Sequence, residues 1–205
     1  MWKAILSPDF FSTILRSATP ILFATLASAI AAKSGICNMA LEGIMLFSAL
    51  FGVIFSSLTN SAWLGLLITM VIGGLIGMIM AFFILNLKTD EILAAIAINL
   101  TATGGTVLIM VAFSGDRGVS SSIRSVSAPT VTLPLIEKIP FIGSVLSGQN
   151  ILTWLAILAV ILLHLFLYKT PLGLAIRAVG EKKNAAESVG ISSRKIKYIA
   201  LIISG

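Results

Sequence analysis

Long apolar stretches without a single charged residue dominate this chain. Three of them cover residues 43–87, 92–115 and 139–168. A helix needs about 20 mainly apolar residues to cross the hydrocarbon core of a bilayer, and the first stretch is long enough for two crossings. Because a helix satisfies its own backbone hydrogen bonds inside a membrane, the pattern predicts helices there. The predicted spans are residues 14–31, 37–58, 62–85, 92–113 and 151–168.

A sixth helix is expected to begin near Tyr198, but the sequence stops at Gly205. Eight residues make only about 12 Å of helix, so this segment is too short to cross and we expect the chain to be truncated. Gly73 and Gly77 form a small-x-x-x-small face, which suits close helix packing. The expected fold is an all-α membrane protein, a polytopic transmembrane helix bundle with five full spans and the start of a sixth. Residues 1–205 are expected to form a single transmembrane domain.

The composition excludes an ordinary soluble domain. Hydrophobic residues make up 58% of the chain and charged residues 11%, against roughly 25% charged residues in soluble domains. The net charge of +6 could fit nucleic acid, but seven of the 14 lysines and arginines lie in residues 169–197, beside apolar spans. Positive charge placed in this way orients helices in the membrane lipid. We therefore expect no nucleic-acid partner.

The charge of residues 169–197 also predicts the orientation of the chain. This segment carries seven lysines and arginines against two glutamates, which favours a cytoplasmic loop. Alternation of the spans then places Lys33 and residues 88–91 inside, and it places the N terminus and residues 114–150 outside. The few positive charges on the outer side favour the opposite orientation, but the seven in residues 169–197 outweigh them.

The predicted extracytoplasmic loop, residues 114–150, mixes polar and apolar residues. Pro129, Pro134 and Pro140 forbid one long helix in it. Its apolar residues still need cover, so the loop either forms short helices on the membrane surface or packs on its own spans. Both alternatives remain open from the sequence.

A short helix is predicted inside the basic loop, over residues 177–187, with Gly190 as its C-terminal stop. Small side chains and basic flanks would allow such a helix to insert into a groove of a partner protein. The charge equally favours an amphipathic helix held by anionic lipids. The residues that define this candidate surface are Arg177, Ala178, Gly180, Ala185, Ala186 and Gly190.

Polar residues inside the apolar spans form a second group of candidates. Glu42 is the one acid well inside an apolar stretch, and such residues often have a function in membranes. If Asn38 is a helix N-cap, Glu42 lies in the second turn, where the helix dipole stabilises it. A translocation-pathway role and a capping role both remain open. Asn99, beside Thr101 and Thr103, should face other helices and either join them or line a pathway.

The sequence contains no recognisable constellation for catalysis. It lacks paired carboxylates, a nucleophile with its base, a cluster of metal ligands and the phosphate-binding pattern G-x-x-x-x-G-K-[ST]. His164 has no Cys, Asp or Glu at ligand spacing and is expected to be a packed or interfacial residue. We therefore expect a protein that is not an enzyme, with no cofactor and no metal. Any energy that it uses must come from a partner chain.

The segment TPLGLAIRAVGEKKNAAESVGISSRKIKY, residues 170–198, resembles the cytoplasmic loop of bacterial ABC-importer permeases of the branched-chain amino acid, ribose and nucleoside superfamily. In that family a G-x-x-x-R-A-v-G…A-A…G-I pattern forms the coupling helix. The chain departs from the pattern at Lys182, where relatives usually carry Asn. The matching residues are Gly173, Arg177, Ala178, Gly180, Ala185, Ala186, Gly190 and Ile191.

Residues 18–50, 90–105 and 139–150 are similar to the subgroup of that family that serves nucleosides and simple sugars. The resemblance implies a permease subunit in the bacterial cytoplasmic membrane that translocates nucleosides, with simple sugars as the alternative. It implies ABC ATPase subunits on the coupling helix, a solute-binding protein outside, and a second, identical or homologous permease subunit. It also places residues 38–43 at a break between helices, near the substrate route.

Two other classes of protein compete with this interpretation. A self-sufficient secondary transporter or channel would carry titratable or ion-coordinating groups along its spans, and apart from Glu42 these are missing. A membrane-embedded enzyme would need an acid-base or metal constellation, which the sequence lacks.

Overall fold

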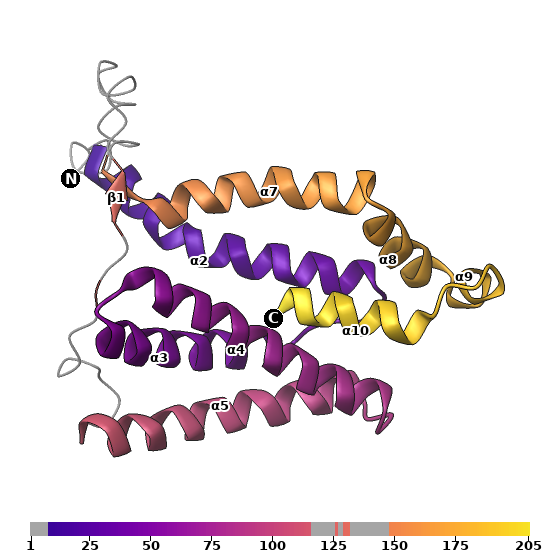
Figure 1. Ribbon diagram of the computed structural model, residues 1–205, viewed down its shortest axis with the longest axis horizontal. Coiled ribbons are helices and arrows are strands. Elements are labelled where there is room, and N and C mark those ends of the chain that lie inside the picture. Colours follow the sequence, from indigo (N-terminus) through magenta and orange to yellow (C-terminus); the bar gives the residue numbers. More distant parts are fainter. Residues whose placement is uncertain (1–7, 116–125, 127–128, 132–147) are drawn as a thin grey trace. The chain divides into compact units, whose positions relative to one another are not determined.

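The fold is known from a computed structural model, which describes residues 8–115, 126, 129–131 and 148–205 (Figure 1). Five of its helices are long and apolar enough to cross a membrane, which confirms the predicted all-α polytopic fold. The elements are α2 (Pro8–Lys33), α3 (Leu41–Thr59), α4 (Ala62–Leu85), α5 (Glu91–Ser114), β1 (Thr130–Val131), β2 (Gln149–Asn150), α7 (Ile151–Lys169), α8 (Pro171–Glu181), α9 (Lys183–Ser188) and α10 (Ser193–Ser204).

The predicted helix bounds hold best where charged or turn residues flank an apolar run. The predicted span 62–85 matches α4. The span 92–113 is one residue shorter than α5 at each end, and the span 151–168 is one residue shorter than α7 at its C-terminal end. Helix α10 begins five residues before the predicted Tyr198. Its buried residues recur at helical spacing from Ser193, so its basic first turn belongs to the same amphipathic helix.

The chain divides into two compact units, and each is described by itself. The first unit comprises Met1–Leu26 and Ser127–His164, and the second comprises Ala27–Val126 and Leu165–Gly205. Helices α2 and α7 each contribute residues to both units.

In the first unit, short polar contacts join elements that are distant in sequence. Strands β1 and β2 pair antiparallel, with Thr130 opposite Asn150. The hydroxyl oxygens of Thr19 in α2 and Thr153 in α7 lie 3.0 Å apart and share a buried hydrogen bond. The strands were not predicted from the sequence, and the short surface helices expected for residues 114–150 fall mostly outside the described residues.

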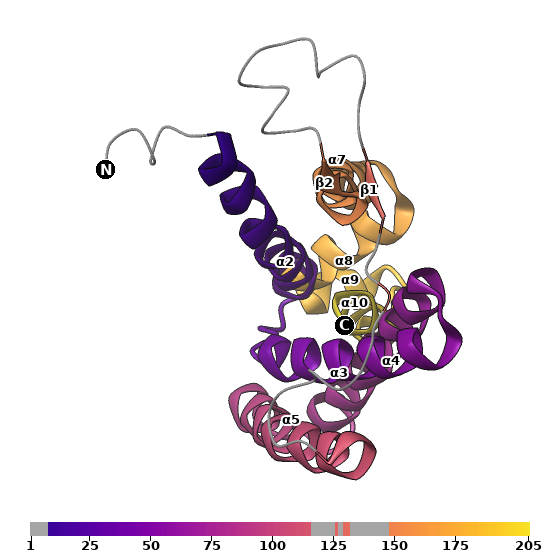
Figure 2. The same cartoon turned by 90° about the vertical axis from the view of Figure 1, so that its left-hand side faces the viewer.

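The second unit is assembled through small residues, which let helix backbones approach closely in a membrane. Viewed along the helices, α3 and α4 lie side by side, with α5 on one side of this pair and α10 on the other (Figure 2). A Cβ atom at Gly65 of α4 would lie 2.9 Å from the Cβ atom of Ser56, and one at Gly43 of α3 would lie 3.1 Å from the Cα atom of Asn99. These helix pairs therefore tolerate no side chain at their crossing points.

The α4–α10 crossing depends on Gly73 and Gly77. A Cβ atom at Gly73 would overlap the carbonyl oxygen of Gly205, and one at Gly77 would overlap the carbonyl oxygen of Leu201. This confirms the predicted close packing on the small-x-x-x-small face. The helix that packs there, α10, follows the basic loop in sequence.

Polar contacts gather the ends of several helices at one end of the second unit, which we call the basic end. The Asn86 side-chain oxygen, after α4, accepts hydrogen bonds from Arg194 and, at 2.8 Å, from the Tyr198 hydroxyl of α10. The Cys37 amide donates to the Glu91 carboxylate at 2.9 Å. The orientation predicted from the charges places Lys33, residues 88–91 and residues 169–197 on the same side of the membrane. These hydrogen bonds join those segments or residues next to them, which is consistent with that prediction. The basic end comprises Lys33, residues 86–91, Lys169 and α8, α9 and the first turn of α10.

Candidate functional site

A sharp elbow joins α7 to α8 and fixes the direction of the basic loop. The Thr170 hydroxyl donates to the Phe166 carbonyl at 2.6 Å and accepts the Gly173 amide at 3.1 Å, so Thr170 is the N-cap of α8. Pro171 occupies the first helical position, where its missing N–H costs nothing. A Cβ atom at Gly173 would lie only 2.6 Å from the Cα atom of Leu167. The elbow therefore requires glycine at this position.

Arg177 strengthens the same elbow. Its guanidinium carbon lies 4.3 Å from the centroid of the Tyr168 ring, a cation–π geometry that links α8 to the last turn of α7. The Arg177 side chain is only half-buried. The cation–π contact thus fixes the positive charge of Arg177 beside the surface that is predicted to dock on a partner protein.

Gly180 lies two helical turns after Gly173 and contacts the link between α2 and α3. A Cβ atom at Gly180 would overlap the Lys33 carbonyl oxygen and lie 3.1 Å from the Gly35 nitrogen. Gly35 has a φ of +77°, a conformation that favours glycine, and its own Cβ would lie 3.3 Å from the Gly180 Cα atom. One side of Gly180 is open to solvent, while the other is in backbone contact with α2. This contact joins the basic loop to the first transmembrane helix.

The prediction of a single helix over residues 177–187 is wrong, because the chain breaks at Lys182. This residue has extended dihedral angles, φ −147° and ψ 91°, and separates α8 from α9. The buried face of α8 contains Ile176 and Val179, and a continuous helix would bring Lys183 onto that face. Burying an unpaired lysine is costly. The break leaves both Lys182 and Lys183 exposed.

Gly190 ends α9 as predicted. Its φ is +87°, its amide donates to the Glu187 carbonyl at 3.0 Å, and the Ile191 amide donates to the Ala186 carbonyl at 3.1 Å. These are the two hydrogen bonds of a Schellman motif.

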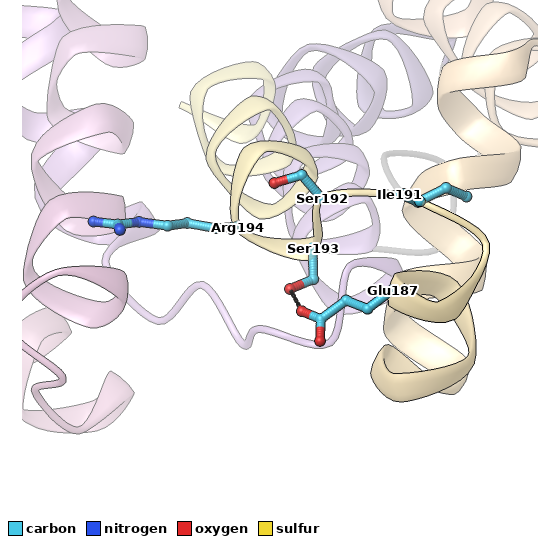
Figure 3. Close-up of a pocket in the computed structure, with 6 residues that line it drawn as sticks. Glu187, Ile191, Ser192, Ser193 and Arg194 are labelled. Atoms are coloured by element: carbon cyan, nitrogen blue, oxygen red, sulfur yellow. Dashed lines mark hydrogen bonds between the residues drawn. The ribbon is translucent and has the colours of Figure 1, made fainter.

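Beyond this turn lies an open hollow of about 320 Å³ between α9 and α10, lined by Glu187 and residues 190–194 (Figure 3). The Ser193 hydroxyl donates to the Glu187 carboxylate, and the Lys183 ammonium lies 4.0 Å from the same group. Arg194 points away from Glu187 and binds Asn86 instead. The hollow is open and has no deep, enclosed part that would retain a small ligand.

The six residues predicted for the partner surface have different environments. Three of them, Gly180, Ala185 and Gly190, are exposed, and Arg177 and Ala178 are half-buried. Ala186 is buried, so it holds α9 against its neighbours. The open surface that a partner can touch is formed by residues 181–185 and 187–190. We call this the α9 surface. It projects from the basic end, while Gly180 and Arg177 hold its base.

The second candidate region is the link from α2 to α3. Asn38, which is 3% exposed, donates from its amide nitrogen to the Ser204 hydroxyl at 2.8 Å and accepts the Ala40 amide at 3.1 Å. The prediction of Asn38 as the N-cap of α3 is wrong, because Ala40 occupies that position and Glu42 lies in the first turn. The amide of Asn38 is used instead by α10, a contact that the sequence does not reveal.

Asn99 of α5 holds the same link from the other side. Its side-chain oxygen accepts the Gly43 amide at 2.8 Å and its nitrogen donates to the Met39 carbonyl at 3.1 Å. Thr101 and Thr103 bond only to carbonyls of their own helix in these contacts. Asn99 thus joins helices, which is one of its two predicted roles. Its contribution to a pathway stays a prediction.

These contacts place the start of α3 deep within the second unit. Asn99 lies eight residues beyond Glu91, which is about 12 Å along α5, and Ser204 lies ten residues beyond Arg194, about 15 Å along α10. The hydrocarbon core of a bilayer is about 30 Å thick. Figure 1 shows the link turning back from the end of α2 before α3 begins. The break therefore lies about 12 to 15 Å along the helices from Glu91 and Arg194, roughly half the thickness of such a core.

Glu42 is exposed at this depth. Within the part of the chain that the structure describes, its carboxylate makes no ion pair, and no hydrogen bond to it is recorded. Gly35 and Ser204, which hold the link on which Glu42 depends, were not predicted. Gly35 follows an apolar helix in the sequence Lys-Ser-Gly and could have been recognised as a helix stop. Nothing in the sequence marks Ser204.

Asn99→Leu is expected to lower the unfolding free energy by about 2 kcal/mol, because the Gly43 amide and the Met39 carbonyl lose their partners. Thermal unfolding of the detergent-solubilised protein measures this loss. Thr103→Val, one turn further along α5, removes a hydroxyl that bonds only within its helix and should change little. Equal melting temperatures for the two variants would show that Asn99 does not hold the break.

No metal site is evident in the described residues, since no group of three or more His, Cys, Asp or Glu side chains comes together there. The candidate chemistry therefore consists of two features. One is the projecting α9 surface, which combines small residues with two lysines and two glutamates. The other is a helix break near half depth with a carboxylate on its open side.

Comparison with known proteins gives a consistent set of matches. Residues 10–205 match the family described as "Branched-chain amino acid transport system / permease component". The chain is 32% identical to the "Putative glucose ABC transporter permease protein TsgC13" of Haloferax volcanii, over 93% of the chain and 57% of that protein. It is 32% identical to the "Guanosine ABC transporter permease protein NupQ" of Bacillus subtilis, over 92% of the chain and 60% of that protein. It is 30% identical to the "Nucleoside ABC transporter permease protein NupC" of Lactococcus lactis, over 95% of the chain and 62% of that protein. The chain thus spans about three fifths of the length of these relatives. No solved structure matches it.

Proposed function

Because the chain belongs to the family of branched-chain amino acid transport system permease components, we propose that it is the membrane-spanning permease subunit of an ATP-driven importer for nucleosides. It is a multi-pass membrane protein with five apolar spans. The main structural support for the proposal is the α9 surface. This surface projects from the basic end, and Gly180 joins it to the first span. A bacterial cytoplasmic membrane is the proposed location.

Nucleosides are favoured as the cargo by two of the relatives, whose names state guanosine and nucleoside transport at 32% and 30% identity. A relative of equal identity is named for glucose, so simple sugars are the second candidate. The two classes share hydroxyl groups, which a carboxylate or amide in the pathway can bind. Uptake measured with both kinds of substrate would separate them.

ABC ATPase subunits are the proposed partners of the α9 surface. The exposed short helix α9 carries the small residue Ala185, and the turn that ends it carries Gly190, so this surface can enter a groove of another protein. The surface carries Lys182 and Lys183 together with Glu181 and Glu187, so a matching groove would offer charges of both signs. ATP binding would then favour one conformation of the bundle, because the ATPase binds the two conformations with different affinity.

Two further partners belong to the same proposal. A solute-binding protein would dock on the extracytoplasmic loop, residues 114–150, most of which lies outside the described residues. A second permease subunit, identical or homologous, would complete the pathway, and lipid would cover the remaining apolar faces. Many large apolar side chains of the helices are exposed in the single chain, for example Leu67 and Leu108, and they require such cover.

A self-sufficient secondary transporter remains the alternative from another class. Reconstitution of the permease with and without its ATPase distinguishes the two. The proposal expects nucleoside uptake that requires the ATPase and ATP. Uptake by the permease alone, driven by an ion gradient, would contradict it.

Ala185→Trp is expected to prevent docking while leaving the fold intact, since Ala185 is exposed on α9. The bulky ring would block entry into the ATPase groove, so ATP-dependent uptake should fall at least tenfold. Co-purification of the ATPase with the tagged permease measures docking directly. Ala185→Ser keeps the side chain small and serves as the matched control. Normal co-purification of the tryptophan variant would rule out the α9 surface as the docking site.

A further inference from the structure

The elbow between α7 and α8 carries two cations whose charge no described carboxylate compensates. Lys169, the last residue of α7, is exposed, and Arg177 of α8 is half-buried. The ion pair recorded in the described ranges joins Lys183 to Glu187, and Glu181, one turn beyond Arg177, lies outside pairing distance of it. A guanidinium has five N–H donors and an ammonium has three. No described acid takes up the donors of these two side chains.

Tyr168 holds one of these cations at the end of α7. The guanidinium carbon of Arg177 lies 4.3 Å from the centroid of the Tyr168 ring, and the tyrosine is itself exposed. The ring attracts the cation but accepts no conventional hydrogen bond, so the N–H donors keep their capacity to bind an oxyanion. Lys169 follows Tyr168 directly. Two positive charges are thus fixed to the same turn of the chain.

The elbow lies where a spanning helix reaches the polar edge of a bilayer. Helix α7 has 19 residues, which is roughly 28 Å at 1.5 Å per residue and close to the thickness of the hydrocarbon core. Leu165 lies one turn before Tyr168 on α7, and Leu172 and Leu174 follow on the first turns of α8. All three leucines are exposed. Apolar side chains beside a tyrosine and two cations are typical of the membrane interface.

The break at Lys182 separates this elbow from the α9 surface. Helix α8 leaves the end of α7 at an angle and α9 follows it (Figure 1). The elbow combines exposed leucines with cations, whereas the α9 surface carries charges of both signs. The sequence left open whether the basic loop meets a partner protein or anionic lipid. The two helices allow each of these contacts to use residues of its own.

We propose that Lys169 and Arg177, with Tyr168 between them, bind the headgroup of an anionic phospholipid whose acyl chains cover Leu165, Leu172 and Leu174. The phosphate oxygens accept hydrogen bonds from the guanidinium and the ammonium, and these bonds are strengthened by charge. A zwitterionic lipid has the same phosphate, but its own cation offsets the attraction. The bound lipid holds α8 at the membrane surface while α9 projects from the basic end. This site does not depend on the proposed transport function.

Quenching by brominated lipids tests the site in the whole chain without transport. A fluorophore is attached to a cysteine that replaces Leu172 in a chain with Cys37→Ser, and the protein is reconstituted in phosphatidylcholine. Increasing fractions of brominated phosphatidylglycerol or brominated phosphatidylcholine are then added. One positive charge near the surface favours an anionic lipid by about fivefold. Half-maximal quenching is therefore expected at a fraction of the anionic lipid that is lower by about fivefold or more, and added salt should weaken this preference.

Three sets of variants assign the preference to the two cations. Lys169→Gln with Arg177→Gln should bring the two half-maximal fractions close together, whereas Arg177→Lys keeps the charge and should keep most of the preference. Lys169→Gln alone should lower the preference without disturbing the fold, because Lys169 is exposed at the end of its helix. Lys182→Gln with Lys183→Gln removes the same charge from the α9 surface and should leave the preference unchanged.

Several results would overturn the site. Equal quenching by the two lipids would mean that the elbow meets lipid without selecting its charge, and no quenching by either would mean that protein covers it. A preference that survives the loss of both cations, or that disappears equally when Lys182 and Lys183 are replaced, would reflect the general charge of the basic end. Displacement of the anionic lipid by inorganic phosphate at constant ionic strength would assign the cations to a soluble anion instead.

Discussion

Gly180→Leu is expected to abolish ATP-dependent uptake and to lower the apparent melting temperature of the permease by roughly 5–10 °C. The new side chain would have to occupy the volume of the Lys33 carbonyl group and the Gly35 backbone. Neither can move as a flexible side chain could, so α8 must separate from the end of α2. Overpacking of this kind costs about 1–3 kcal/mol or more. Thermal unfolding in detergent and uptake in proteoliposomes measure the two effects.

Gly104→Leu provides the control for this experiment. Gly104 lies within α5, is exposed, and has no atom within 4 Å of the position its Cβ would take. The same substitution should be tolerated there. If Gly180→Leu transported normally, the contact between α8 and the α2–α3 link would be dispensable, and coupling would have to follow another route.

Gly77→Leu is expected to produce the largest loss of stability, on the order of 3 kcal/mol or more. The leucine side chain would overlap the backbone of Leu201 and force α10 away from α4. Since α10 also supplies Ser204 to Asn38, the break before α3 should loosen at the same time. A fall in melting temperature would report the first effect. Faster labelling of a cysteine placed at the buried Ala40, in a chain with Cys37→Ser, would report the second, since Cys37 itself is already exposed.

The same Gly104→Leu control applies to Gly77. A second comparison uses Gly77→Ala, which adds only one methyl group and should cause a smaller loss of the same kind. If Gly77→Leu melted at the temperature of the unmodified chain, α10 would not pack on α4 through these glycines. The proposed support of the helix break by Ser204 would then also have to be abandoned.

The Gly180 contact connects the proposed docking surface with the start of α3. Gly180 rests on Gly35 at the basic end, and four residues later Met39 is held by Asn99. A displacement of α8 would therefore reach the start of α3 through a short stretch of backbone that is hydrogen-bonded at several points. This link can transmit a signal if the bundle has two conformations with different positions of α8. The ATPase would then shift the populations of the two conformations.

The corrections show which parts of the site local patterns can predict. Gly190 was recognised because a helix stop needs only a positive φ, a property of the residue itself. The break at Lys182 was missed because the nearest glycine, Gly180, lies inside α8 and does not mark its end. It arises from the burial of Ile176 and Val179, which excludes Lys183 from the same face.

The sequence by itself determined the membrane class, the number and approximate bounds of the spans, and the clustering of positive charge after α7. These follow from the length of apolar runs and from the cost of burying charge, which act residue by residue. Only the tertiary structure decided that Gly180 meets Lys33, that Asn38 binds Ser204 and that Glu42 is exposed in the first turn of α3. Those facts depend on contacts between residues far apart in the chain, and such contacts arise from the packing of whole helices rather than from any local preference.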